Sequence, residues 1–243
     1  MRMVFSRKGF DTSAGGGPSP IVEGRPMSLP IPAGSGPSRT TYGDLDLGDH
    51  AAQASRGRLG ADDLCHHDPM FLPGGRAMLG QCGAAQTHLE RQGVGIGDIF
   101  LFFGLFCAEE ERPHHRLFGF LRIEEVLRLD DALADRLAQL AELGMPHAIG
   151  LHAKNDTLYE GAGRVASQAS EALRLTVPEG PPSLWNVPRW LHETGLSYHH
   201  RADRWRECGR LQSVARGQEF VADIGDRADA REWLAGVVAA IEG

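Results

Sequence analysis

The side chains best suited to chemistry in this sequence are His66 and Asp68, which one residue separates. On a strand, side chains two positions apart point to the same face, so this imidazole and this carboxylate would lie together. They are two of the three ligand types in the facial triad of non-haem iron oxygenases. We therefore predict that His66 and Asp68 are catalytic and bind a divalent metal such as Fe(II). The alternative is a surface hydrogen-bonded pair, because an Asp-Pro step often opens a turn.

The third ligand of this predicted metal site must come from a distant part of the chain. Of the neighbouring His199 and His200, we take His200 as the candidate. Arg210 lies a short way beyond and could bind a carboxylate group of a substrate through two parallel hydrogen bonds.

The glycine-rich stretch at residues 6–19 is a second candidate site. Glycine backbone can approach a phosphate closely, and a neighbouring lysine or arginine supplies charge. The stretch is not a P-loop, because the order G-x-x-x-x-G-K-[ST] is absent. Asp11 could be a general base or a metal ligand. We predict substrate binding by Ser6, Arg7, Lys8, Gly15 and Gly16. The alternative is a flexible turn that closes over the end of a sheet.

Glu219 is the third candidate, in the block GQEFV at residues 217–221. A carboxylate can act as general acid or base when burial raises its pKa. We predict this catalytic role for Glu219 and a substrate contact for Gln218. The alternative is that Glu219 pairs with the nearby Arg216 and only orders the loop, since paired surface charges stabilise little.

The elements that would position these residues follow from apolar patterning. Runs at residues 99–106 and 117–126 have the length and the aromatic and β-branched content of strands. Shorter strands are predicted at 2–6, 147–152 and 173–177, and a hairpin at 21–32. Helical spacing predicts helices within 73–93 and 130–144 and from 226 onward.

Together these elements predict a single domain over residues 1–243 of the α+β class. We expect a mixed, mainly antiparallel sheet or a small barrel, with about three helices. The N-terminal third is rich in loops, and residues 33–64 predict one long irregular segment.

Composition narrows the class of protein. The net charge of −7 argues against general polyanion binding. No stretch reaches the ~18 apolar residues that cross a bilayer, and the first residues do not resemble a secretory signal. The four cysteines form no C-x-x-C pair, which argues against a disulfide framework and a zinc knuckle. We predict a cytoplasmic protein with no membrane partner.

Several ordered blocks resemble one family, the nucleotide-modification-associated domain family, third type. The blocks are SRKGFD at 6–11, GG at 15–16, PSP at 18–20, SLPIP at 28–32, CHHDP at 65–69, GDIFLFFG at 97–104 and GQEFV at 217–221. The resemblance extends over roughly residues 1–222 and implies a role in the modification of DNA or nucleotide bases. Residues 94–103 and 117–126 also resemble the PUA-like barrels that hold modified bases.

Three functions follow as hypotheses. The first is a metal-dependent enzyme that modifies a nucleotide or a nucleic-acid base. The second is a non-catalytic, PUA-like reader of modified bases, in which aromatic side chains such as Trp185 stack on the base. The third is a non-haem iron oxygenase that tailors a small molecule or a peptide.

Overall fold

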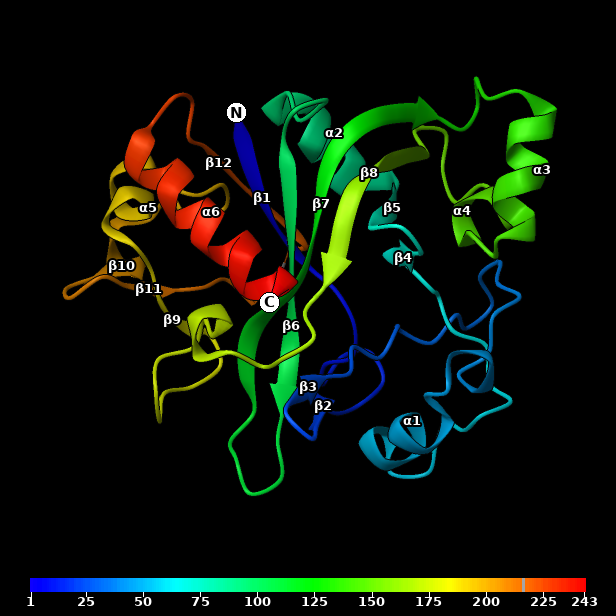
Figure 1. The fold of residues 1–243 in the computed structure, drawn as a ribbon, viewed down its shortest axis with the longest axis horizontal. Coiled ribbons are helices and arrows are strands. Elements are labelled where there is room, and N and C mark those ends of the chain that lie inside the picture. The colour runs from blue at the N-terminus through cyan, green and yellow to red at the C-terminus, as the bar shows by residue number, and fades with distance from the viewer. Residues whose placement is uncertain (216) are drawn as a thin grey trace.

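The computed structural model describes residues 1–215 and 217–243, and its centre is a large β-sheet (Figure 1). Seven strands follow one another in the order β12-β1-β6-β7-β8-β5-β4, and a hairpin of β2 and β3 joins beside β6. β1 and β2 pair with β6 in parallel, and the other pairs are antiparallel. The strands are β1 (Arg2–Arg7), β2 (Ser19–Val22), β3 (Arg25–Pro26), β4 (Met70–Leu72), β5 (Arg76–Gln81), β6 (Ile99–Cys107), β7 (His114–Arg128), β8 (Thr157–Val165) and β12 (Glu219–Asp223).

β6 and β7 form the middle of the sheet, as the two apolar runs predict. Alternate residues of β6 belong to different cores. Leu101 and Phe103 pack on one face of the sheet, and Phe100 and Phe102 pack on the other. A strand that is covered on both faces reads as a continuous apolar run rather than as an alternating one.

Helices cover both faces of the sheet. Helix α6 (Ala228–Glu242) packs Leu234, Val237 and Ile241 into the core of one face. The same side holds α5 (Arg189–Thr194) and a small sheet of β9 (Leu184–Asn186), β11 (Arg210–Gln212) and β10 (Trp205–Arg206). Helix α2 (Gly83–Gln92) packs Leu89 against the other face.

The remaining helices lie toward the β4 end of the sheet and below it. Helices α3 (Ala134–Glu142) and α4 (Pro146–Ile149) pack on each other beside β4 and β5, away from α5 and α6 (Figure 1). Helix α1 (Gly48–Ser55) lies near β2, and short 3-10 helices span Gly43–Leu45, Glu171–Leu173 and Ala202–Arg204. Among the described residues, no helix has the length and apolar character needed to span a membrane.

The predicted α+β class is confirmed, and the alternative of a small barrel is wrong. The sheet is open, because its end strands β12 and β4 do not pair with each other in residues 1–215 and 217–243. The same residues form six α-helices rather than about three. The irregular segment predicted at 33–64 contains α1 and one of the 3-10 helices.

Three local predictions are wrong for physical reasons. Residues 73–93 begin with strand β5, in which Met78 and Leu79 enter different cores, and the helix starts only afterwards. Residues 147–152 form the end of α4 and a turn, because Pro146 favours the first turn of a helix over a strand. Residues 173–177 make only isolated bridges, at Arg174 and Thr176.

Strand β8 has no counterpart in the sequence prediction. Its glycines, Gly161 and Gly163, weaken the signal of a strand. A Cβ atom at Gly161 would overlap the carbonyl oxygen of Arg122 on β7, so the close approach of the two strands requires glycine there.

Candidate metal centre

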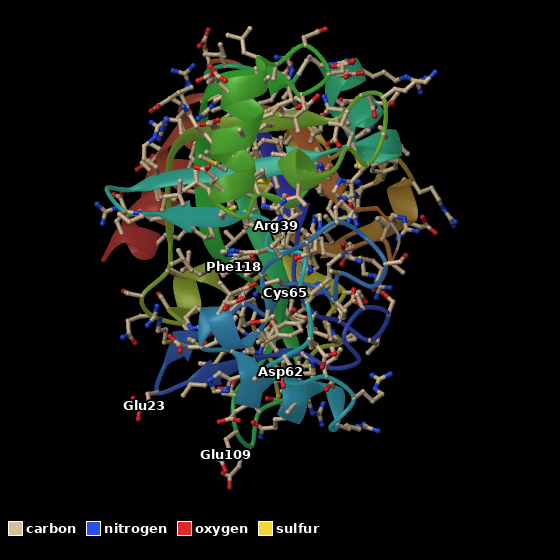
Figure 2. The ribbon with its side chains drawn as sticks, turned by 90° about the vertical axis from the view of Figure 1, so that its right-hand side faces the viewer. Glu23, Arg39, Asp62, Cys65, Glu109 and Phe118 are labelled. Carbon is tan, nitrogen blue, oxygen red and sulfur yellow. The ribbon has the colours of Figure 1, made fainter. Side chains whose placement is uncertain are left out.

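Three histidines from two distant segments meet beside the sheet. One ligand nitrogen from each lies within 4.8 Å of the others, and the residues are His66, His147 and His152. The ring centroid of His66 is 5.3 Å from each of the other two, which lie 4.2 Å apart and nearly parallel. Figure 2 shows the region of Cys65, which precedes His66, between the segment of α1 and helices α3 and α4.

Asp68 faces two of these histidines. Its Oδ2 lies 3.9 Å from Nε2 of His66 and 4.0 Å from Nε2 of His147, and its carboxylate is 3% exposed. The other oxygen, Oδ1, accepts a hydrogen bond of 2.9 Å from the backbone N–H of Gly80. Tetrahedral ligands at ~2.05 Å from one ion lie about 3.3 Å apart. The three histidines are therefore close to the spacing at which one cation fits between them, and Asp68 borders two of them.

His147 is held in place by a buried carboxylate and by a glycine. Its Nδ1 hydrogen-bonds to Asp156, which also accepts a bond of 2.6 Å from the backbone N–H of His152. A carboxylate on one ring nitrogen fixes the other nitrogen as the metal-binding one. A Cβ atom at Gly80 would lie 2.6 Å from Cγ of His147, so only glycine leaves room for the ring.

The protonation of the imidazoles suits a metal. Burial lowers the pKa of His66 to about 4, and the neighbouring Asp68 only partly opposes this shift. Burial also lowers the pKa of His152. Both rings are therefore neutral at neutral pH, the state in which a ring nitrogen binds a metal. Imidazoles with one carboxylate suit zinc, iron and similar transition metals.

A second group of possible ligands shares His147 and adds Cys82 and Asp156. Burial raises the pKa of the Cys82 thiol, and the nearby carboxylates raise it further. A metal needs the thiolate, and Nδ1 of His147 already bonds to Asp156. The set of three histidines is therefore the better candidate for a metal site.

The structure brings together His66 and Asp68 as the sequence predicts, but not on a strand. Both lie on an irregular segment just before β4. His200 does not join them, because it is exposed on another segment and lies outside both ligand groups found in residues 1–215 and 217–243. His147 and His152 take the place predicted for it. The only sequence signal for them is that two histidines and Asp156 occur within one short stretch.

The histidines line a cavity of about 600 Å³ together with the N-terminal loop. Arg7, Lys8 and Asp11 contribute charge to this cavity, and Gln218 lines it from the loop before β12. The guanidinium of Arg7 donates to the carbonyls of Ala215 (2.8 Å) and residue 214 (3.0 Å), which ties the two loops together. The cavity thus joins a candidate cation site to a cationic loop.

Lys8 forms an ion pair with a deeply buried carboxylate. Oε1 of Glu219 accepts hydrogen bonds from Nζ of Lys8 (3.2 Å), Oγ of Ser6 (3.0 Å) and the amide of Gln81. Burial raises the pKa of Glu219, while Lys8 opposes the shift. The second oxygen, Oε2, has no partner among the described residues. The predicted pairing with Arg216 lies outside those residues.

The other predicted site residues differ in where they lie. Asp11 lines the cavity, but its Oδ1 is engaged in a turn, accepting from the backbone N–H groups of residues 13 (2.7 Å) and 14 (2.8 Å). Gly15 and Gly16 shape the turn, because a Cβ atom would overlap the ring of Phe10 or the guanidinium of Arg58. They are not part of the cavity wall in the described chain.

Arg210 lies away from the candidate site. It is exposed on β11, opposite Asn186 in the small sheet, and lines neither of the two cavities described. The predicted carboxylate clamp therefore does not form beside the histidines.

The fold and the site define an α+β protein with a histidine-rich cavity at one side of an open sheet. A family model described as nucleotide modification associated domain 3 matches residues 2–223. The chain belongs to this family, which confirms the resemblance in its sequence blocks. No match was found among curated proteins or among solved structures.

Proposed function

We propose that this chain is a metal-dependent enzyme that modifies a nucleotide or a nucleic-acid base. The observation that carries the proposal is the meeting of His66, His147 and His152 within 4.8 Å at the wall of a cavity. In the proposal these three histidines hold one divalent cation, with Asp68 as a fourth ligand. The family description, nucleotide modification associated, supplies the class of substrate.

The cation would supply Lewis-acid activation of an oxygen atom in the cavity. Asp156 would keep His147 in the metal-binding tautomer through its bond to Nδ1. Lys8 and Arg7, on the opposite loop, would bind the negative charge of the nucleotide. Glu219 would hold the ammonium group of Lys8 in position, since Oε1 is 3.2 Å from Nζ.

The overall charge favours a small substrate over duplex DNA. The chain carries a net charge of −7, and duplex binding depends on many cationic contacts with phosphates. A nucleotide or a short single strand needs only the few cationic groups that the cavity contains, Arg7 and Lys8.

Metal analysis of the purified chain tests the proposal. Protein dialysed against Zn²⁺ or Mn²⁺, or against Fe²⁺ under anaerobic conditions, should retain about one ion per chain, as measured by elemental mass spectrometry. His66→Ala and His152→Ala should lose it. His200→Ala is the matched control, because His200 is an exposed histidine outside the cluster, and it should retain the ion. If the wild type retains no ion, or if all variants retain the ion equally, the proposed metal site is wrong.

Turnover separates the enzyme from its alternatives. The metal-loaded chain, incubated with nucleotides and oligonucleotides, should change the mass of at least one of them. Tight binding without any change in mass would favour a reader of modified bases instead. Oxygen consumption with the iron-loaded chain would favour the oxygenase reading.

A further inference from the structure

A second cavity of about 360 Å³ adjoins the first. Lys8, Gly9 and Asp68 line both cavities, so they form the wall between them. The two neighbouring histidines, His66 and His67, lie on opposite sides of this wall. His66 lines the first cavity and His67 lines the second. A ligand that passes Lys8 would therefore contact both spaces.

The second cavity is more apolar in its side chains than the first. It is lined by Met27, Leu45, Leu47, Phe71, Phe118 and Val165. Phe71 is fixed by an edge contact with Phe102, with ring centroids 5.8 Å apart, so its position in the wall is defined by the core. The first cavity has no phenylalanine, tyrosine or tryptophan in its wall within the described chain.

A few polar groups stand among these apolar side chains. His67 lines this cavity, and the two nitrogen atoms of its ring can form hydrogen bonds. Ser28 adds a hydroxyl group, and Arg25 is exposed at the rim. Small-molecule sites of about 300–1,000 Å³ usually combine apolar walls with a few such polar groups.

We propose that the second cavity binds the base of the nucleotide, and that the sugar–phosphate end reaches past Lys8 to the histidine cluster. This inference rests on the proposed function and adds the orientation of the substrate. A planar base suits the space beside Phe71, and the ring nitrogens of His67 suit its polar edge. The cationic Lys8, which is 10% exposed, stands where the base would end and the charged part begin.

Removal of the base should therefore weaken binding strongly. Stacking of a base on an aromatic side chain changes affinity by about 5- to 150-fold. Calorimetry with the zinc-loaded full chain should show that at least one of the common ribonucleoside and deoxyribonucleoside monophosphates binds at least ~10-fold more tightly than ribose 5-phosphate. Ribose 5-phosphate that binds as tightly as every nucleoside monophosphate would overturn the inference without any variant.

A matched pair of variants locates the base. Leu45 and Leu59 are half-buried leucines that pack on the same small core, but only Leu45 lines the second cavity. Leu45→Trp should fill the cavity and weaken binding of the preferred nucleoside monophosphate at least ~10-fold, while ribose 5-phosphate binds as before. Leu59→Trp should bind both as the wild type does. Zinc content shows that each variant retains the site.

The outcomes distinguish this inference from the proposed function. Wild-type affinity for the nucleoside monophosphate in zinc-loaded Leu45→Trp would overturn the base site and leave the proposed function standing. Failure of the zinc-loaded wild type to bind any nucleoside monophosphate would overturn the base site, whereas the proposed function fails only if the chain retains no metal or changes the mass of no nucleotide or oligonucleotide.

Discussion

Substitution of Gly80 by alanine tests the histidine cluster without replacing any of its histidines. The added Cβ atom would lie 2.6 Å from Cγ and 2.8 Å from Nε2 of His147, closer than real Cβ contacts allow. The ring must move, and its bond to Asp156 fixes the direction in which Nε2 points. The backbone N–H that Gly80 donates to Asp68 is kept in the variant. The nearest atoms to the added Cβ atom all belong to His147, so the change acts first on that ring.

The size of the effect follows from the proposed role of His147 as a metal ligand. Loss of the group that orients a ligand typically weakens metal binding about 10- to 100-fold. At a free metal concentration of 100 times Kd, binding stabilises the wild type by about 2.7 kcal/mol. A 100-fold weaker site leaves about 0.4 kcal/mol under the same conditions. For a chain of this size the metal-induced rise in Tm should fall from about 5–11 °C to about 1–2 °C.

Differential scanning fluorimetry with and without zinc measures this rise. Gly236→Ala is the matched control, because a Cβ atom at Gly236 meets nothing within 4 Å and the residue lies in α6. It should keep the full rise and gain about 0.5–1 kcal/mol of intrinsic stability. A Gly80→Ala variant with the wild-type rise in Tm would refute the reasoning, because His147 would then not be a ligand.

Three further predictions concern the surroundings of the site. Glu219→Ala leaves Lys8 without its buried partner and should lower the free energy of unfolding by about 3–5 kcal/mol in urea, whereas Glu124→Ala, at an exposed ion pair, should leave it unchanged. Burial lowers the pKa of His199 to about 4, so as the pH falls the unfolded chain takes up this proton before the folded chain does. The free energy of unfolding should therefore fall by up to about 1.4 kcal/mol per pH unit between about pH 6.5 and pH 4. His199→Gln should lose this part of the pH dependence, and an unchanged pH dependence in the variant would contradict the prediction. Cys82→Ser should leave the Co²⁺ absorption spectrum unchanged, because the thiol is not in the histidine set; loss of a sulfur-to-cobalt band would place the metal at Cys82 instead.

The sequence predicts the centre of the sheet better than its edges. The runs at β6 and β7 are apolar because both faces are covered, and such runs are recognisable by their length and their aromatic and β-branched content. The sequence does not predict β8, because Gly161 is needed for the close approach of the β7 and β8 backbones. The residue pattern of one strand does not reveal how closely its neighbour lies. β5 is not predicted because its apolar residues, together with those of α2, follow the spacing of one helix.

Half of the candidate metal centre is readable from the sequence. His66 and Asp68 are two positions apart, and their side chains lie 3.9 Å apart although the segment is irregular rather than a strand. His147 and His152 match no metal motif, since a short helix and a turn bring them together. His200 is a wrong choice because proximity in the sequence to the other predicted residues says nothing about how the chain returns to the site.

The pairing of β1 has a consequence for how the protein is made. β1 lies between β6 and β12, so β1 has as one neighbour a strand that leaves the ribosome more than 200 residues later. Until then β1 exposes an unpaired edge, and edges of this kind invite wrong partners. Ser6 pairs with Glu219 in this register, so β12 also brings the carboxylate that holds Lys8. We expect a nascent chain that stalls before residue 219 to have the histidines but no ordered cationic loop, so translation delays assembly of the candidate site until β12 has joined the sheet.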